Sequence, residues 1–147
     1  MTEATSASKD PTSFVGPYPF TAIQAVRRGF SKFNVFSGRA TRSEFWYWLL
    51  FTYIVNLLVT LIAVQFLMGV DRKPAERRDF VDGLSTLVGL IFMLPSIAVQ
   101  TRRLHDVNRS GWSALLCLTV IGVVPYVYWL SSRGDDFTNS YGDPSSP

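Results

Sequence analysis

The sequence is poor in the residues that build catalytic and metal sites. Its 147 residues contain one cysteine, Cys117, and one histidine, His105. A single cysteine excludes an intramolecular disulfide, and one histidine without a spaced set of further ligands gives no support to a metal site. The patterns of nucleotide-binding loops and of nucleophile elbows are also missing. The sequence therefore predicts no cofactor, no bound metal and no catalytic residue.

A cleavable signal peptide is missing from the start of the sequence. Residues 1–19 are rich in Ser, Thr and Pro and have no apolar stretch behind a basic start. Because this segment has almost nothing to bury, we predict a disordered tail over 1–19. A single membrane domain is expected over 20–144, followed by a short tail at 145–147.

Apolar and aromatic residues are abundant, at 48% and 14% of the chain, although 17% of it is charged. The charges and the apolar residues stand in separate blocks, which is typical of a membrane protein. In a soluble protein the net charge of +3 would suggest a nucleic-acid partner. Here the basic residues flank apolar runs, as they do at cytoplasmic membrane boundaries, so we expect no nucleic-acid partner.

Three apolar runs are long enough to cross a bilayer. At about 1.5 Å per residue, the run over 45–68 gives a helix of about 36 Å, against a hydrocarbon core of about 30 Å. The runs over 83–101 and 111–130 are shorter but sufficient. The charged connection over 69–82 predicts a solvated loop or a short surface helix. The predicted fold is all-α and integral to the membrane, with three transmembrane helices.

A short N-terminal amphipathic helix is expected before the first span. Apolar and basic residues alternate with helical spacing from Thr21 over about three turns. Two placements remain open, because the helix fits either the headgroup plane, with its basic face toward anionic lipid, or other helices of the protein. The pattern is set by Ile23, Val26, Phe30 and Phe33, with Arg27, Arg28 and Lys32 between them.

The first span has a clear start signal. Thr41 and Glu44 have the spacing of a capping box, which predicts a helix from about Arg42. The aromatic residues 46–48 that follow predict an interfacial belt.

Inside the runs, Asn56 and Gln65 are expected to hydrogen-bond a neighbouring helix. Pro95 predicts a kink in the second span, and Gly122 with Pro125 predicts a bend in the third. An alternative function uses the same residues: a transporter or channel subunit whose polar groups and kinks open a path within an oligomer.

Three spans would leave the two ends of the chain on opposite sides of the membrane. Lys and Arg residues in the flanks favour a cytoplasmic N-terminus, by eight against five. The eight are Arg27, Arg28, Lys32, Arg39, Arg42, Arg102, Arg103 and Arg109, and the five are Arg72, Lys73, Arg77, Arg78 and Arg133.

This topology brings two charged segments, 38–44 and 102–112, to the same inner face. Asp106 lies three and four residues after Arg103 and Arg102, so it can face either of them on a helix, and Glu44 is the acid for the arginine left over. The candidate residues are Arg39, Arg42, Glu44, Arg102, Arg103, His105, Asp106 and Arg109.

Three interpretations of these residues remain open. Their ion pairs lock the helix ends together, or their arginines form a basic pocket for an anionic lipid headgroup or another phosphate-bearing ligand. The third interpretation is a lipid-headgroup enzyme with His105 as general base, for which Glu44 is the only second group within expected reach.

Three ordered motifs resemble those of the DUF805 family of small bacterial inner membrane proteins. The first covers residues 36–46 (FSGRATRSEFW), the second 102–112 (RRLHDVNRSGW), and the third includes Asn139, Tyr141 and Gly142. The family's usual proline before the mid-span glycine of the last helix is replaced by Thr119 upstream of Gly122.

The resemblance implies a multi-pass protein of the bacterial plasma membrane and implies no activity. Our leading hypothesis is a non-enzymatic structural or interaction protein whose inner-face residues organise the helices and bind anionic lipid or a partner. Three short spans leave little room for a private solute path, so we expect a partner membrane protein or a homo-oligomer.

Overall fold

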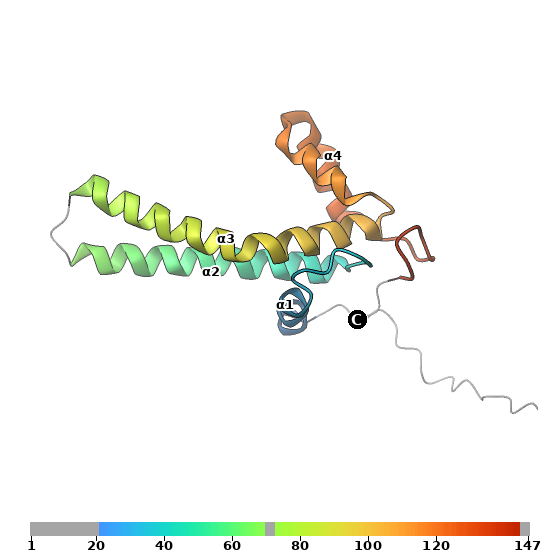
Figure 1. Ribbon diagram of the computed structural model, residues 1–147, viewed down its shortest axis with the longest axis horizontal. Helices are drawn as coiled ribbons and strands as arrows, with labels where there is room; N and C mark the ends of the chain where they lie inside the picture. The colour runs from blue at the N-terminus through green and yellow to red at the C-terminus, as the bar shows by residue number, and fades with distance from the viewer. Residues whose placement is uncertain (1–20, 70–72, 145–147) are drawn as a thin grey trace, which may run out of the picture.

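The computed structural model describes residues 21–69 and 73–144, so the predicted tails at 1–19 and 145–147 lie outside the described residues. The elements are α1 (Ala22–Ser31), α2 (Arg42–Met68), α3 (Pro74–Asp106), a 3₁₀ helix η1 (Gly111–Leu118) and α4 (Val120–Ser131). All five are helical, which confirms the all-α class. Figure 1 shows α2 and α3 as a long hairpin, with α1 and the η1–α4 segment both at its open end.

Two of these helices are long and apolar enough to cross a membrane, namely α2 with 27 residues and α3 with 33. The predicted start of α2 at Arg42 and its end at Met68 are confirmed. The connection between α2 and α3 is shorter than the predicted 69–82. Helix α3 already begins at Pro74, so most of the charged segment forms its first turns. Pro at the first helical position lacks only an N–H that has no partner within the helix, which explains this early start.

Polar contacts join α2 to α3 along their interface. Asn56 donates its side-chain Nδ2–H to the carbonyl oxygen of Ser85 at 3.5 Å, and the hydroxyls of Thr60 and Ser85 are 3.1 Å apart. The expectation that Asn56 bonds a neighbouring helix is therefore confirmed. Gln65, by contrast, lies on the exposed face of α2. The polar groups of Asn56, Thr60 and Ser85 therefore hydrogen-bond to one another and join the two helices.

Trp46 and Tyr47 at the start of α2 are exposed, as the predicted aromatic belt requires, whereas the prediction is wrong for Trp48. Trp48 is 2% exposed, and its indole N–H donates to Ser96 Oγ of α3 at 3.0 Å. A buried indole needs such a partner for its N–H, and Ser96 supplies it. Trp48 is therefore a packing residue.

Helix α1 packs on α2, as in the second of its two expected placements. Phe30 makes ring contacts with Trp48, Phe51 and Phe92, at centroid distances of 5.2, 6.0 and 5.9 Å. Gly29 is buried, and a Cβ at this position would overlap the Trp48 indole. The missing side chain therefore lets α1 approach α2 closely, while Arg27 stays exposed.

We expect Gly29→Ala to loosen α1. The added methyl has to displace the Trp48 indole, and overpacking of this kind costs about 1–3 kcal/mol of the free energy of unfolding. Thermal denaturation and limited proteolysis in detergent measure the effect. Gly89→Ala is the matched control, because a Cβ there meets nothing within 4 Å. Equal stability of the two variants would contradict this packing.

The third predicted span is not one helix. The run over 111–130 is divided at Thr119 into η1 and α4, and α4 has 12 residues. The Thr119 hydroxyl accepts a hydrogen bond from the Gly122 N–H at 3.1 Å and so caps a new helix. Gly122 then allows α4 to fold against η1, since a Cβ there would overlap the Leu116 carbonyl oxygen. The break thus lies at Thr119, before Gly122 and Pro125, where the bend was predicted, and a third crossing is not confirmed.

Candidate functional site

The site lies at the open end of the α2–α3 hairpin, where the two charged motifs meet. The turn before α2 contains Gly38 with φ +82°, a conformation that glycine adopts without strain, and the Ala40 N–H donates to the Arg102 carbonyl oxygen at 3.0 Å. Helix α3 ends in a Schellman motif, with Asn108 at φ 53° and the Arg109 N–H bonded to the Leu104 carbonyl at 2.9 Å. Both motifs are thus held by backbone contacts.

One carboxylate joins two arginines from distant parts of the chain. Asp106 Oδ1 accepts from Arg39 Nε at 2.8 Å, and Asp106 Oδ2 pairs with Arg103 Nη1. The Arg103 side chain is fully buried, and those of Arg39 and Asp106 are 1% and 7% exposed. Such charge-assisted bonds are among the strongest polar contacts, and here they are shielded from water.

The second carboxylate serves the arginine that Asp106 leaves over, as the sequence predicts. Arg102 Nη2 donates to Glu44 Oε1 at 3.2 Å, and Arg28 Nε lies 3.5 Å from Glu44 Oε2. Thr41 caps α2 as expected, by accepting from the Glu44 N–H at 3.1 Å. In a full capping box the Glu44 carboxylate would also accept from the Thr41 N–H. Here it faces the guanidinium groups of Arg102 and Arg28 instead. We call Arg28, Arg39, Glu44, Arg102, Arg103 and Asp106 the charge cluster.

The C-terminal segment closes over the charge cluster, which the sequence did not predict. Arg39 donates to the backbone carbonyls of Asp135 and, at 2.8 Å, Phe137. Arg103 donates to those of Leu130, at 3.0 Å, and Ser132. The two arginines therefore bind carbonyls at and after the end of α4, where helical partners run out.

Further contacts fix the same tail. The Asp135 N–H donates to the Asp106 carbonyl oxygen at 2.9 Å, and Asn139 Nδ2 donates to that of His105 at 2.9 Å. A Cβ at Gly134 would overlap the Asp106 carboxylate. Asn139 of the third motif supplies one of these contacts. The only sign of this role in the sequence was that the segment is rich in turn-forming residues.

His105 has a packing role in this arrangement. Its ring stacks on Tyr141 at 3.8 Å between centroids and 6° between planes, and Nδ1 faces the Gly38 carbonyl oxygen at 3.2 Å. The enzymatic interpretation required Glu44 beside this ring, but Glu44 is buried against Arg102 and Arg28. The two groups therefore do not form an acid–base pair.

Like His105, the candidate residues Arg42 and Arg109 lie outside the charge cluster. Both are exposed, and Arg109 stands over the Trp129 ring at 4.8 Å. Lys32 of the α1–α2 connection lies nearby, and partial burial, followed by repulsion from Arg28 and Arg102, lowers its pKa. The surface around the charge cluster is therefore basic.

The charge cluster contains four guanidinium groups and two carboxylates, and each carboxylate pairs with two of the guanidinium groups. Groups of three or more His, Cys, Asp or Glu side chains that would hold a metal ion do not occur among residues 21–69 and 73–144. The arrangement fits the joining of segments and the attraction of anions, and it presents no nucleophile beside a base.

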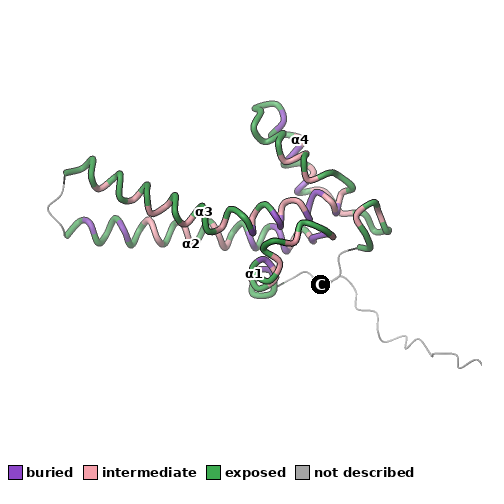
Figure 2. The backbone as a smooth tube through the Cα atoms, viewed as in Figure 1, coloured by how far each residue is buried: buried purple, intermediate pink, exposed green. Residues whose placement is uncertain are grey.

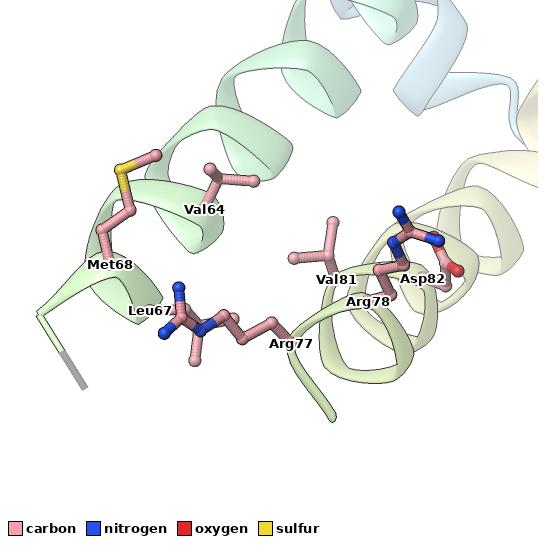
Figure 3. Close-up of a pocket in the computed structure, with 7 residues that line it drawn as sticks. All are labelled: Val64, Leu67, Met68, Arg77, Arg78, Val81 and Asp82. Atoms are coloured by element: carbon pink, nitrogen blue, oxygen red, sulfur yellow. The ribbon is translucent and has the colours of Figure 1, made fainter. Parts of the chain in front are cut away.

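A separate recess of about 200 Å³ lies at the other end of the hairpin, between α2 and the start of α3. Figure 3 shows its apolar walls, with Val64 and Val81 facing each other, and the side chains of Arg77 and Arg78.

Comparison with known proteins gives a consistent result. The family described as "Protein of unknown function (DUF805)" matches residues 33–143. The inner membrane protein YhaH of Escherichia coli K12 is 40% identical over 97 residues, which cover 65% of this chain and 69% of YhaH. The inner membrane protein YhaI of the same strain is 34% identical over 109 residues, which cover 74% and 83%.

A partial likeness extends to a larger protein. One subunit of the NADH-quinone oxidoreductase of Paraburkholderia phymatum is 30% identical over 86 residues, or 54% of this chain and 24% of that larger protein. No solved structure matches the chain. The extent of the family match, together with the two inner membrane relatives, shows that this chain belongs to the DUF805 family.

Proposed function

We propose that this protein is a non-enzymatic structural protein of the bacterial inner membrane, which uses its basic boundary surface to bind anionic lipid. One observation carries the proposal: the strongest polar groups of the chain are used to join segments to one another. Arg39 and Arg103 together reach Asp106 and the carbonyls of five later residues. A reaction site needs polar groups that are free to meet a substrate, whereas these are occupied and buried.

The same geometry supports a cytoplasmic position for the charge cluster. If α2 and α3 both cross the membrane, every basic residue outside residues 72–78 and the predicted tail lies at one boundary, giving nine against four. The nine are Arg27, Arg28, Lys32, Arg39, Arg42, Arg102, Arg103, Arg109 and Arg133, and the four are Arg72, Lys73, Arg77 and Arg78. This excess of basic residues on one side is larger than the eight against five of the three-span topology. It supports a cytoplasmic position for the N-terminal end of α2.

Anionic lipid is the ligand that this surface suits. The charge cluster has two more guanidinium groups than carboxylates, and the exposed Arg27 and Arg42 add to it on the outside. Near a membrane surface each basic residue contributes about 1 kcal/mol to attraction for anionic lipid before screening by salt.

The test compares two double variants. Arg27→Gln/Arg42→Gln should weaken binding of phosphatidylglycerol, titrated into the detergent-purified protein, by about tenfold, a value reduced for screening of exposed charges. Arg77→Gln/Arg78→Gln removes the same charge from the opposite end and should leave this affinity nearly unchanged. Native mass spectrometry counts the bound lipid. Equal losses in both variants would contradict the proposed lipid surface.

A second candidate function is attachment to another membrane protein. It is favoured by the likeness to part of a larger protein, because a related segment then occurs within a multi-subunit enzyme. Purification of the chain from native membrane in mild detergent tests it, and a partner recovered in fixed ratio is the expected result. The channel interpretation has less support, since Asn56 bonds to α3 rather than facing a path.

A further inference from the structure

The tip of the η1–α4 hairpin is the most exposed apolar part of the described chain. Leu118, Val120 and Ile121 are 79%, 92% and 87% exposed, and Val124 is 72% exposed. Figure 2 shows that most of the hairpin is exposed at the end farthest from α3. Contiguous apolar side chains this exposed mark a surface that meets something other than water.

The base of the same hairpin has the opposite character. It starts where Gly111 packs against Thr101 of α3 and ends where Arg103 binds the Leu130 carbonyl oxygen. Both ends therefore lie beside the charge cluster. Exposed Trp112 and Tyr128 belong to the hairpin, and aromatic residues of this kind favour the headgroup level of a membrane.

The hairpin is too short to cross a bilayer. Twelve residues of α4 give about 18 Å at 1.5 Å per residue, roughly half of a hydrocarbon core of about 30 Å. In Figure 1 the η1–α4 hairpin stands off from α3, and its free end is displaced toward the α2–α3 turn. If α2 and α3 cross the membrane, this displacement carries the tip from the charge cluster into the adjacent leaflet.

The turn at the tip provides partners for its own backbone. The Thr119 N–H donates to the Leu116 carbonyl at 3.0 Å, and the Val123 N–H donates to that of Thr119 at 3.1 Å. The Thr119 hydroxyl donates to the Leu116 carbonyl at 3.0 Å and accepts from the Gly122 N–H at 3.1 Å. In hydrocarbon an unpaired backbone group is costly, so a turn that enters it needs such internal bonds.

From these observations we propose that η1–α4 is a re-entrant hairpin whose tip contacts the acyl chains of the leaflet on the charge-cluster side. The chain then enters and leaves this leaflet at the same boundary. Consequently the α1 segment and the C-terminal segment lie on the same side of the membrane, instead of on opposite sides as three spans require. This inference rests on the proposed crossing of the membrane by α2 and α3.

The chain contains a built-in probe for the lipid contact. Cys117 is its only cysteine and is exposed near the tip. We would label it with an environment-sensitive maleimide in liposomes and compare quenching by aqueous iodide with quenching by lipids brominated on their acyl chains. Brominated lipid should quench strongly and iodide weakly. For the control, Cys117→Ser/Ser140→Cys, iodide should quench strongly, since Ser140 is exposed in the C-terminal segment.

A second measurement maps the sides of the membrane in the Cys117→Ser background. An impermeant maleimide should label Ser31→Cys and Ser140→Cys from one side and Lys73→Cys from the other. Labelling of Ser31→Cys and Ser140→Cys from opposite sides would overturn the re-entrant hairpin. If Lys73→Cys labels from the same side as Ser31→Cys, the proposed crossing of α2 and α3 fails instead. If neither quencher reaches Cys117, a protein surface covers the tip and the lipid contact is overturned.

Discussion

The Asp106→Asn variant is expected to lose most of its folded yield in membranes. The carboxylate is the shared partner of Arg39 and Arg103, and all three side chains are almost completely buried. Removing one partner of a buried ion pair leaves an uncompensated charge and typically costs 3–5 kcal/mol, taken here as an order of magnitude of about 4 kcal/mol. Small domains are stable by only about 5–15 kcal/mol, so such a loss is severe.

The measurement is the fraction of protein that remains monodisperse after extraction, together with protease protection of the C-terminal segment. Protection should fall first in that segment, because Arg39 and Arg103 hold its carbonyls only while Asp106 holds the arginines. Asp136→Asn is the matched control: this residue pairs with Arg133, but their side chains are 61% and 76% exposed. Exposed pairs contribute about 0–1 kcal/mol. If Asp106→Asn behaved like this control, the charge cluster would not organise the fold.

Local signals in the sequence predicted the parts of the fold that depend on neighbouring residues. The start of α2 follows from the Thr41 cap and the uncharged run behind it, and these depend on a few adjacent positions. The meeting of the segments 38–44 and 102–112 was predicted as well, although they are far apart, because the spans between them must bring both motifs to one face. The pairing of Arg39 with Asp106 was not predicted, since Asp106 was expected to face Arg102 or Arg103.

The parts that the sequence did not predict depend on tertiary contacts. The run over 111–130 has the composition of a span, and only the close approach of Gly122 to Leu116, with Arg103 holding the end of α4, shows that it folds back. Composition measures how apolar a segment is and contains no information on where its end is bound. The same limit applies to Trp48. The residues next to a tryptophan in the sequence do not show whether its indole lies at a membrane boundary or in the core.

The Glu44–Arg102 pair allows a stricter test, because its two halves are not equivalent. Arg102 Nε and Nη1 are buried and have no hydrogen-bond partner among the described residues, so Glu44 is its main source of compensation. Glu44, in contrast, also lies close to Arg28. Glu44→Gln should therefore destabilise the protein more than Arg102→Met does, by an amount on the order of 1 kcal/mol or more.

The double variant Glu44→Gln/Arg102→Met should be more stable than the sum of the single effects implies, since neither buried charge is then left alone. Couplings between residues in contact are about 0.5–3 kcal/mol, and thermal denaturation of the four proteins in the same detergent measures this one. The Glu44→Gln variant with Asp136→Asn gives the matched additive case, because the two sites share no contact. Strict additivity of Glu44→Gln and Arg102→Met would mean that the two groups do not compensate each other. Within the charge cluster Arg102 would then contribute nothing to the stability of Glu44, which would be left with Arg28 of α1 as its ion-pair partner, and the buried pairing would rest on Asp106 and its two arginines.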